Sequence, residues 1–297
     1  MRRWLICAGL LGLMVLFLWD APTVSQAVRD GLSLCAGSVI PALFPFFVAS
    51  SCFTALGLAE DLGRLLAPVL CPLLRCSATG CAAFLLGLLG GYPVGGRAVA
   101  DLFRRRAVDR AEARRLLAFC NNAGPAFTLT VAGLGCFGSL RAGLLLYAVQ
   151  VCAAVVTARL QPPAPRSAAA PMPPVRESPA AAFVGAVTAG AAAMGQVCGF
   201  TVFFLVLTRL LSARLGLTHP AALGALELTG GVLRLTADRG GFITAAALLS
   251  WGGLSVHGQT AAALSGSGLP LGPYLIGKAE QTAIAAALAA AVSFLLF

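Results

Sequence analysis

Four ionisable residues, Glu227, His257, Lys278 and Glu280, stand in otherwise apolar parts of the sequence. A charge inside an apolar stretch is costly, so such residues are candidates for binding a solute or relaying protons. A neutral imidazole at His257 is suited to either task. The structural alternatives stay open: Glu227 and Lys278 can reach a water interface, and His257 can make a structural hydrogen bond.

Two glycine-rich segments interrupt apolar runs in different halves of the chain. Residues 90–98 read GGYPVGGRA and residues 252–260 read GGLSVHGQT, and pairing Gly90 with Gly252 aligns the glycine pairs, a valine and a further glycine. Glycine and proline interrupt helices, and in a membrane an interrupted backbone survives only where protein or water surrounds it. Matched breaks favour a transporter's binding site, and close helix packing is the alternative. The candidate residues here are Gly91, Tyr92, Pro93, Gly95, Ser255, His257 and Gln259.

A pair of amides, Asn121 and Asn122, precedes Pro125 between two apolar stretches. These amides and the N–H groups of the following helix are a candidate anion site, because helix N-termini favour negative charge. A plain corner between two helices is the alternative. The arginine cluster at 104–115 is interpreted as a solvated amphipathic helix that sets topology.

The elements that must position these residues are transmembrane helices. The chain is 59% hydrophobic and 11% charged, with a mean hydropathy of +0.88. A chain this apolar must expose surface to lipid, and its continuously apolar runs do not alternate as the strands of a membrane barrel would. We therefore expect an all-α, polytopic integral membrane protein. The clearest spanning runs are Trp4–Trp19, Ala42–Ala59, Ala142–Ala158, Phe183–Leu207 and Leu275–Phe297.

The chain is expected to divide into four parts. Residues 1–22 form an N-terminal transmembrane helix with a cytoplasmic start, and 161–179 form a Pro-rich cytoplasmic linker. Residues 23–160 and 180–297 form two repeats, expected to be inverted, with discontinuous helices or hairpins. The sequence alone does not fix the number of spans.

Charge, cysteines and motifs exclude several classes of function. The net charge of +10 is attributed to arginines of cytoplasmic loops, not to nucleic-acid binding. The ten cysteines include no C-x-x-C pair, and we expect no metal and no cofactor. No ATP-binding or hydrolase motif occurs, so we expect no enzymatic activity.

These motifs together resemble the nucleoside-recognition (gate) domain membrane proteins and, more narrowly, the sporulation integral membrane protein YlbJ family. The resemblance rests on IPALFPFF at 40–47, GGYPVGG at 90–96, NNAGP at 121–125, LELTG at 226–230 and GGLSVHGQ at 252–259. It implies a two-repeat transporter-like fold with solute contacts at discontinuous helices. For the YlbJ family it implies a role in spore formation, with dipicolinate, a small aromatic dianion, moved out of the mother cell.

We therefore expect a permease for a small anionic solute such as dipicolinate, with Glu227 and Lys278 in the solute site. The expected partners are that solute and the lipid bilayer, but no nucleic acid; a homo-oligomer is left open. The expected location is the bacterial inner membrane, in a sporulating cell the mother-cell or outer forespore membrane. The alternatives are a nucleoside or metal-ion permease of the gate family, and a non-transporting scaffold for envelope or spore assembly.

Overall fold

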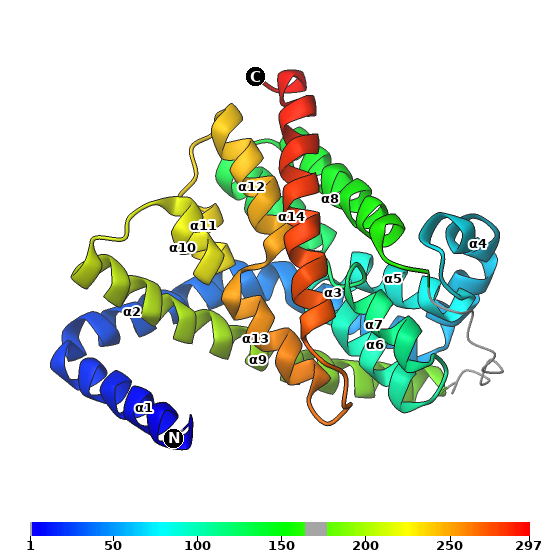
Figure 1. Cartoon of the computed structure of the whole chain (residues 1–297), viewed down its shortest axis with the longest axis horizontal. Helices are drawn as coiled ribbons and strands as arrows, with labels where there is room; N and C mark the ends of the chain where they lie inside the picture. The colour runs from blue at the N-terminus through cyan, green and yellow to red at the C-terminus, as the bar shows by residue number, and fades with distance from the viewer. Residues whose placement is uncertain (1, 164–176) are drawn as a thin grey trace.

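The computed structural model describes residues 2–163 and 177–297, and every regular element within them is helical (Figure 1). Most of the predicted Pro-rich linker at 161–179 lies outside these residues. The first half contains α1 (Arg2–Trp19), α2 (Ala21–Leu34), η1 (Cys35–Val39), α3 (Ile40–Ala55), α4 (Leu58–Leu74), α5 (Ala78–Gly90), α6 (Val94–Arg104), α7 (Arg110–Leu117), η2 (Phe127–Cys136) and α8 (Leu140–Leu160). The second half contains α9 (Pro179–Leu215), α10 (Pro220–Leu226), α11 (Leu228–Val232), α12 (Arg239–Trp251), α13 (Gly253–Leu264), α14 (Gly272–Val292) and η3 (Ser293–Leu295).

Within the described residues, four helical segments are long and apolar enough to cross a membrane: Ala21–Ala55, Leu140–Leu160, Pro179–Leu215 and Gly272–Leu295. A fifth crossing results if α4 and α5, which are bent by 92° at their break, form one span. The chain is therefore a polytopic helical membrane protein, as predicted.

The five predicted apolar runs all form helix, with changed bounds. The run predicted at Ala42–Ala59 belongs to a helix that begins at Ala21 and ends at Ala55, because Gly57 adopts a positive φ of 73° before α4. The N-terminal run forms α1, whose apolar part, Arg3–Trp19, is shorter than the four candidate spans. Its crossing of the membrane stays a prediction.

The helix pairs α5–α6 and α12–α13 have closely similar local structures. Helices α5 and α12 each contain 13 residues, and each is capped at its N-terminus by a side-chain oxygen, of Ser77 and of Asp238. Each ends at a glycine with positive φ, 75° at Gly91 and 89° at Gly252. The predicted alignment, which paired Gly90 with Gly252, is therefore out of register by one residue.

The two breaks differ in the backbone that comes after the glycine. After Gly91 the backbone stays non-helical through a cis Tyr92–Pro93 peptide until α6 begins at Val94. After Gly252, only Gly253 within 252–258 also has a positive φ, 76°, and α13 continues from there, so the predicted second break at 252–258 is confined to its first two residues. Proline accounts for the difference, because it lacks an N–H and disfavours helix in the residue before it, whereas 254–258 contain no proline.

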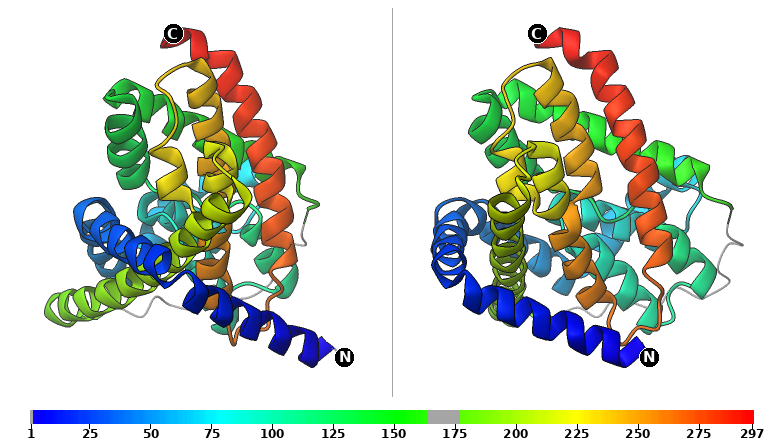
Figure 2. Two further views of the ribbon diagram at one scale, coloured as in Figure 1. Left: turned by 90° about the vertical axis from the view of Figure 1, so that its left-hand side faces the viewer. Right: turned by 60° about the vertical axis from the view of Figure 1, so that its left-hand side comes forward.

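Elements of the two halves meet in the core. Helix α9 packs along α2 and α3, and α14 packs along α12 and α8 (Figures 1 and 2). One buried apolar cluster contains Tyr92 and Phe127 from the first half together with Leu249 and Val256 from the second. The two broken helix pairs therefore lie against one another at the centre of the molecule.

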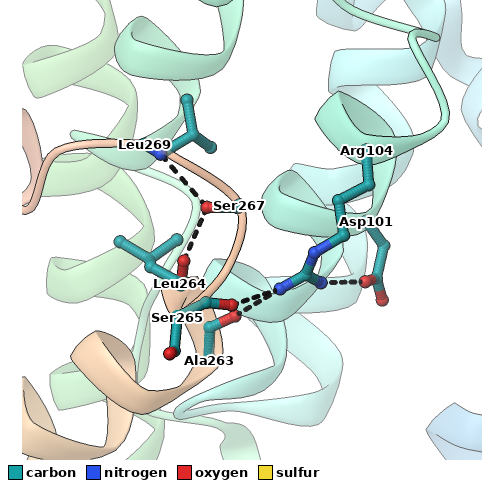
Figure 3. A network of polar contacts seen from close by, with 7 residues as sticks. All are labelled: Asp101, Arg104, Ala263, Leu264, Ser265, Ser267 and Leu269. Carbon is teal, nitrogen blue, oxygen red and sulfur yellow. Dashed lines mark hydrogen bonds and ion pairs between the residues drawn. The ribbon is translucent and has the colours of Figure 1, made fainter.

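The arginine cluster is not a single solvated helix. Arg104 ends α6, pairs with Asp101 at 2.7 Å, and donates to the carbonyl oxygens of Ala263, near the end of α13, and of Ser265 just after it (Figure 3). Arg115, on α7, is buried and donates to the carbonyl oxygen of Arg75 at 2.9 Å. The turn between α6 and α7 separates these residues, so part of the cluster connects the two halves instead of facing water.

Candidate functional site

A small cavity of about 40 Å³ lies where the two breaks meet. Its apolar lining comes from η1, α3, η2, α9, α11, α13 and the segment between α7 and η2. Its polar lining consists of Thr201, Glu227, Thr229, Ser255 and Gln259, with the hydroxyl-bearing ring of Tyr92 and the backbone of Gly91. Five predicted site residues therefore share one cavity: Gly91, Tyr92, Glu227, Ser255 and Gln259.

The cavity is closed to anything larger than water. Small-molecule sites occupy about 300–1,000 Å³, whereas this space holds only a few water molecules. Anything larger than water would fit only if the surrounding helices moved apart. The structure therefore represents a closed state of the site.

Glu227 places a carboxylate on the cavity wall. It occupies the gap between α10 and α11, where its two oxygens accept hydrogen bonds from the backbone N–H groups of Thr229 at 3.1 Å and Gly230 at 2.6 Å. The residue is buried. A buried carboxylate that caps a helix N-terminus has its charge offset by the free N–H groups and the helix dipole. Glu227 thus fixes the start of α11 beside the cavity.

Tyr92 connects the two breaks. Its hydroxyl donates to the carbonyl oxygen of Leu249 in α12 at 2.7 Å, and it accepts from Lys278 at 3.4 Å. The Lys278 ammonium nitrogen also lies 5.3 Å from the centre of the Tyr92 ring. Tyr92 lines the cavity, whereas Lys278, which contacts it, is not among the residues that line the cavity.

The asparagine pair lies behind the cavity wall, not in the cavity. The side-chain oxygen of Asn121 accepts from the N–H of Gly96 at 3.1 Å, and its side-chain nitrogen donates to Thr260 at 2.9 Å. Asn122 donates to the carbonyl oxygen of Phe119 at 2.8 Å. In this closed state the pair ties α6 to α13 instead of presenting free amides to an anion.

Lys278 and Asn122 are joined through Gln281. Lys278 donates to the backbone oxygen of Asn121 at 2.8 Å and to the side-chain oxygen of Gln281 at 2.7 Å. Gln281 in turn donates to the side-chain oxygen of Asn122 at 2.8 Å. All four side chains are buried, so they form a closed polar network in the apolar core.

Three further predicted residues, Pro93, Gly95 and His257, do not line the cavity. Pro93 immediately precedes α6. A Cβ added at Gly95 would overlap the carbonyl oxygen of Cys120, so Gly95 allows α6 to pass close to the backbone of the segment after α7. The Nδ1 atom of His257 lies 3.0 Å from the Tyr274 hydroxyl, its ring packs edge-on against Trp251, and its Nε2 has no hydrogen-bond partner.

Sequence reasoning missed several members of the site. Gln281 carried a usable signal, because a residue three positions after Lys278 lies on the same helix face. Thr260 also carried such a signal, because it lies four residues after Val256 on the same face of α13. Its hydroxyl donates to the carbonyl oxygen of Val256. Thr201 and Tyr274 carried no signal, because each becomes part of the site only through long-range packing.

Three cysteines, Cys71, Cys76 and Cys81, lie close together although they form no C-x-x-C pair. The Cys81 sulfur lies 3.6 Å from the sulfurs of both Cys71 and Cys76, because the turn between α4 and α5 folds the three together. The described part of the chain holds no group of three or more His, Cys, Asp and Glu residues that could bind a metal ion.

Comparison with known proteins identifies one clear relative. The chain is 26% identical over 307 aligned residues to the sporulation integral membrane protein YlbJ of Bacillus subtilis (strain 168), and the match covers 88% of this chain and 75% of the relative. No protein-family model matches the chain, so the wider resemblance to gate-domain proteins stays a prediction. No solved structure matches it. This similarity, over most of an all-helical polytopic chain, makes the protein a distant homologue of a sporulation integral membrane protein, YlbJ of Bacillus subtilis.

Proposed function

We propose that this protein is a membrane transporter for a small anionic solute, with dipicolinate in spore formation as the expected solute. The observation that carries the proposal is the small cavity, lined by apolar and polar side chains including Glu227, where two broken helix pairs meet. Discontinuous helices around a central site are typical of secondary transporters, in which the helix pairs move to open the site to either side. The small volume fits the closed state of such a cycle.

Two repeats, inverted with respect to one another, are part of this proposal. The support is local: α5–α6 and α12–α13 share a capped 13-residue helix, a glycine with positive φ and a following short helix. Each pair contributes to the cavity, Gly91 from the first and Ser255 from the second.

Preference for an anion is supported by the charge around Lys278. Its side chain is fully buried, and no ion pair within the described residues includes it. Lys278 contacts Tyr92, so movement of that ring in an open state would bring to the cavity a basic side chain that is positively charged whenever it holds its proton. A buried, uncompensated cation attracts a carboxylate strongly, because the surroundings screen it weakly.

The test measures uptake of radiolabelled dipicolinate and of a nucleoside panel in proteoliposomes. We expect dipicolinate flux that is abolished by Glu227→Ala and by Lys278→Ala, with both variants still inserted in the membrane. The matched control is Glu280→Ala, which removes a half-buried carboxylate whose partner is Gln161 instead of the cavity residues. Wild-type uptake by both site variants would contradict these residue assignments.

The panel also separates the alternatives. Flux of nucleosides but not of dipicolinate would indicate a nucleoside permease, and a parallel assay with divalent metal ions would identify a metal permease. Flux of none of these solutes would favour a scaffold that assembles a sporulation or envelope complex. In a sporulating cell we place the transporter in the mother-cell or outer forespore membrane.

A further inference from the structure

Lys278 is the single lysine in a chain whose other twenty basic residues are arginine. It is also fully buried, whereas most of the arginines in the described residues are exposed or half-buried. A guanidinium group keeps its proton at any ordinary pH, but a lysine amine releases its proton when the surroundings disfavour charge. Lys278 can therefore lose its charge, whereas an arginine at this position would stay positively charged.

The hydrogen-bond network fixes the state of Lys278 in this closed structure. The carbonyl oxygen of Phe119 can only accept, so the nitrogen of Asn122 must face it and its oxygen must face Gln281. The nitrogen of Gln281 then donates to Asn122, and its oxygen faces Lys278. These donor and acceptor roles fix which way the side-chain amides of Asn122 and Gln281 face.

The third contact of Lys278 must also be a donated bond. The hydroxyl hydrogen of Tyr92 is already given to the carbonyl oxygen of Leu249 at 2.7 Å, so its oxygen can only accept from Lys278. Lys278 thus donates three bonds, to Asn121, Gln281 and Tyr92. Three donated hydrogens require the ammonium form, because a neutral amine has only two.

The groups around Lys278 provide no counter-charge. The titratable side chains that face it are Tyr92 from the first break, His257 from α13 and Tyr274 from its own helix. The other charged or titratable groups on α14 and on the helices packed against it either have partners elsewhere or are exposed. Those with partners are Glu280 with Gln161, Arg110 with Gly268, Glu112 with Ser77, Arg115 with Arg75, Tyr147 with Leu88, Arg159 with Pro72 and Arg239 with Ser293; Arg114, Arg141 and Cys152 are exposed. The ammonium is therefore held by neutral oxygens alone, an arrangement in which proton loss is accessible.

We propose that Lys278 is a proton-binding site whose occupancy controls the position of Tyr92 and thereby opens or closes the cavity. The proton site itself does not depend on the proposed transport function. Only the role of that site in solute movement rests on it. When the proton leaves, one of the three bonds must be lost, and the longest of them is the 3.4 Å bond to Tyr92. The attraction between the ammonium and the Tyr92 ring is lost with it. Tyr92, whose ring lines the cavity, is then held by Leu249 alone.

The single lysine makes a direct test feasible. Full-length protein in nanodiscs, grown with lysine carrying carbon-13 at Cε, gives one side-chain NMR signal that needs no assignment. We expect this signal to change in one step below about pH 10.4, where a free lysine amine titrates, and ring signals of labelled Tyr92 to change at the same pH. A lysine signal that stays in the ammonium position to about pH 10, or in the amine position down to about pH 6, overturns the proposal.

Two variants test whether Tyr92 is the connected residue. Tyr92→Phe removes the third acceptor, so the lysine signal should change at a lower pH than in the wild type. Tyr147→Phe removes a hydroxyl that donates to the carbonyl oxygen of Leu88, and should leave the lysine signal unchanged. Equal behaviour of the two variants would contradict the proposed connection to the cavity.

A transport assay separates this inference from the proposed function. Wild-type proteoliposomes containing a pH-sensitive dye should show proton movement together with dipicolinate flux, and Lys278→Met should lose the proton movement. If Lys278 titrates as expected in the nanodiscs but no dipicolinate crosses, the proton site stands and the proposed function fails. If dipicolinate crosses but the lysine signal does not titrate, the function stands and this inference fails.

Discussion

The hydroxyl of Tyr92 donates a hydrogen bond of 2.7 Å to the carbonyl oxygen of Leu249, which lies three residues before the glycine that ends α12. A side chain of the first broken helix pair thus satisfies a backbone group near the break in the second. In an apolar interior an unpaired carbonyl is costly, so this bond favours the arrangement in which the two breaks adjoin. The closed cavity depends on that arrangement.

Replacing Tyr92 by Phe should weaken the closed arrangement. Leu249 would lose its side-chain donor and Lys278 one of its acceptors, at a cost of about 1–2 kcal/mol in the free energy of unfolding. We expect dipicolinate flux to fall about tenfold, because the same bonds position the cavity wall. Denaturant titration in nanodiscs and uptake in proteoliposomes provide the two measurements.

The matched control for this change is Tyr147→Phe. The Tyr147 hydroxyl also donates to a helix carbonyl, that of Leu88 at 3.2 Å, but lies outside the cavity lining and makes no bond to Lys278. It should cost a similar amount of stability and leave flux near the wild-type value. If both variants transported at the same rate, the Tyr92 bond would have no role in transport.

Glu227→Gln should destabilise the protein and reduce transport together. The amide can accept only one of the two hydrogen bonds that the carboxylate accepts from Thr229 and Gly230. One buried N–H is left unpaired, at about 1–3 kcal/mol, and α11 loses the negative charge at its N-terminus. Thermal unfolding monitored by circular dichroism, with uptake on the same preparation, measures both effects.

Asp238→Asn makes the same chemical change at an exposed helix cap. Asp238 accepts from the N–H of Gly241 at 2.7 Å at the start of α12, and asparagine is an equally good cap. Stability should change by no more than about 0.5 kcal/mol, with transport retained. An equal loss at the two positions would mean that capping alone, and not the cavity, explains the effect at Glu227.

The sequence predicted residue types well and their partners poorly. Glu227 and Lys278 were found because a lone charge in an apolar stretch has few explanations, and both are buried in the structure. That Lys278 would bond to the backbone of Asn121 could not be foreseen, because the contact forms only when α14 packs beside the loop after α7. The length of the second break was overestimated, because glycines permit a departure from helix but do not require it.

Gly95→Ala tests the closeness of the crossing between α6 and the segment after α7. The added methyl group would overlap the carbonyl oxygen of Cys120, and backbone at that point cannot move without disturbing Asn121. We expect a loss of about 3 kcal/mol or more in the free energy of unfolding, or failure to accumulate in the membrane. Fluorescence-detected size-exclusion chromatography measures both outcomes.

Gly195→Ala is the control for that substitution. Gly195 lies within α9, and nothing lies within 4 Å of the position that a Cβ would occupy. In a helix interior this exchange should stabilise the protein by about 0.5–1 kcal/mol. Equal stability of the two alanine variants would show that α6 does not approach Cys120 as closely as described.

Mild oxidation should join Cys81 to Cys71 or Cys76. Both sulfurs lie 3.6 Å from that of Cys81, and a disulfide requires an approach to about 2 Å, which small movements at the turn between α4 and α5 can supply. Treatment with a copper–phenanthroline oxidant, followed by alkylation in denaturant and mass spectrometry of the peptides, identifies the product. Cys81→Ser should abolish the cross-link, whereas Cys136→Ser should retain it, because the Cys136 sulfur bonds instead to the carbonyl oxygen of Leu235. A cross-link that survives Cys81→Ser would place the bend between α4 and α5 differently from the structure, and with it the start of the first broken helix.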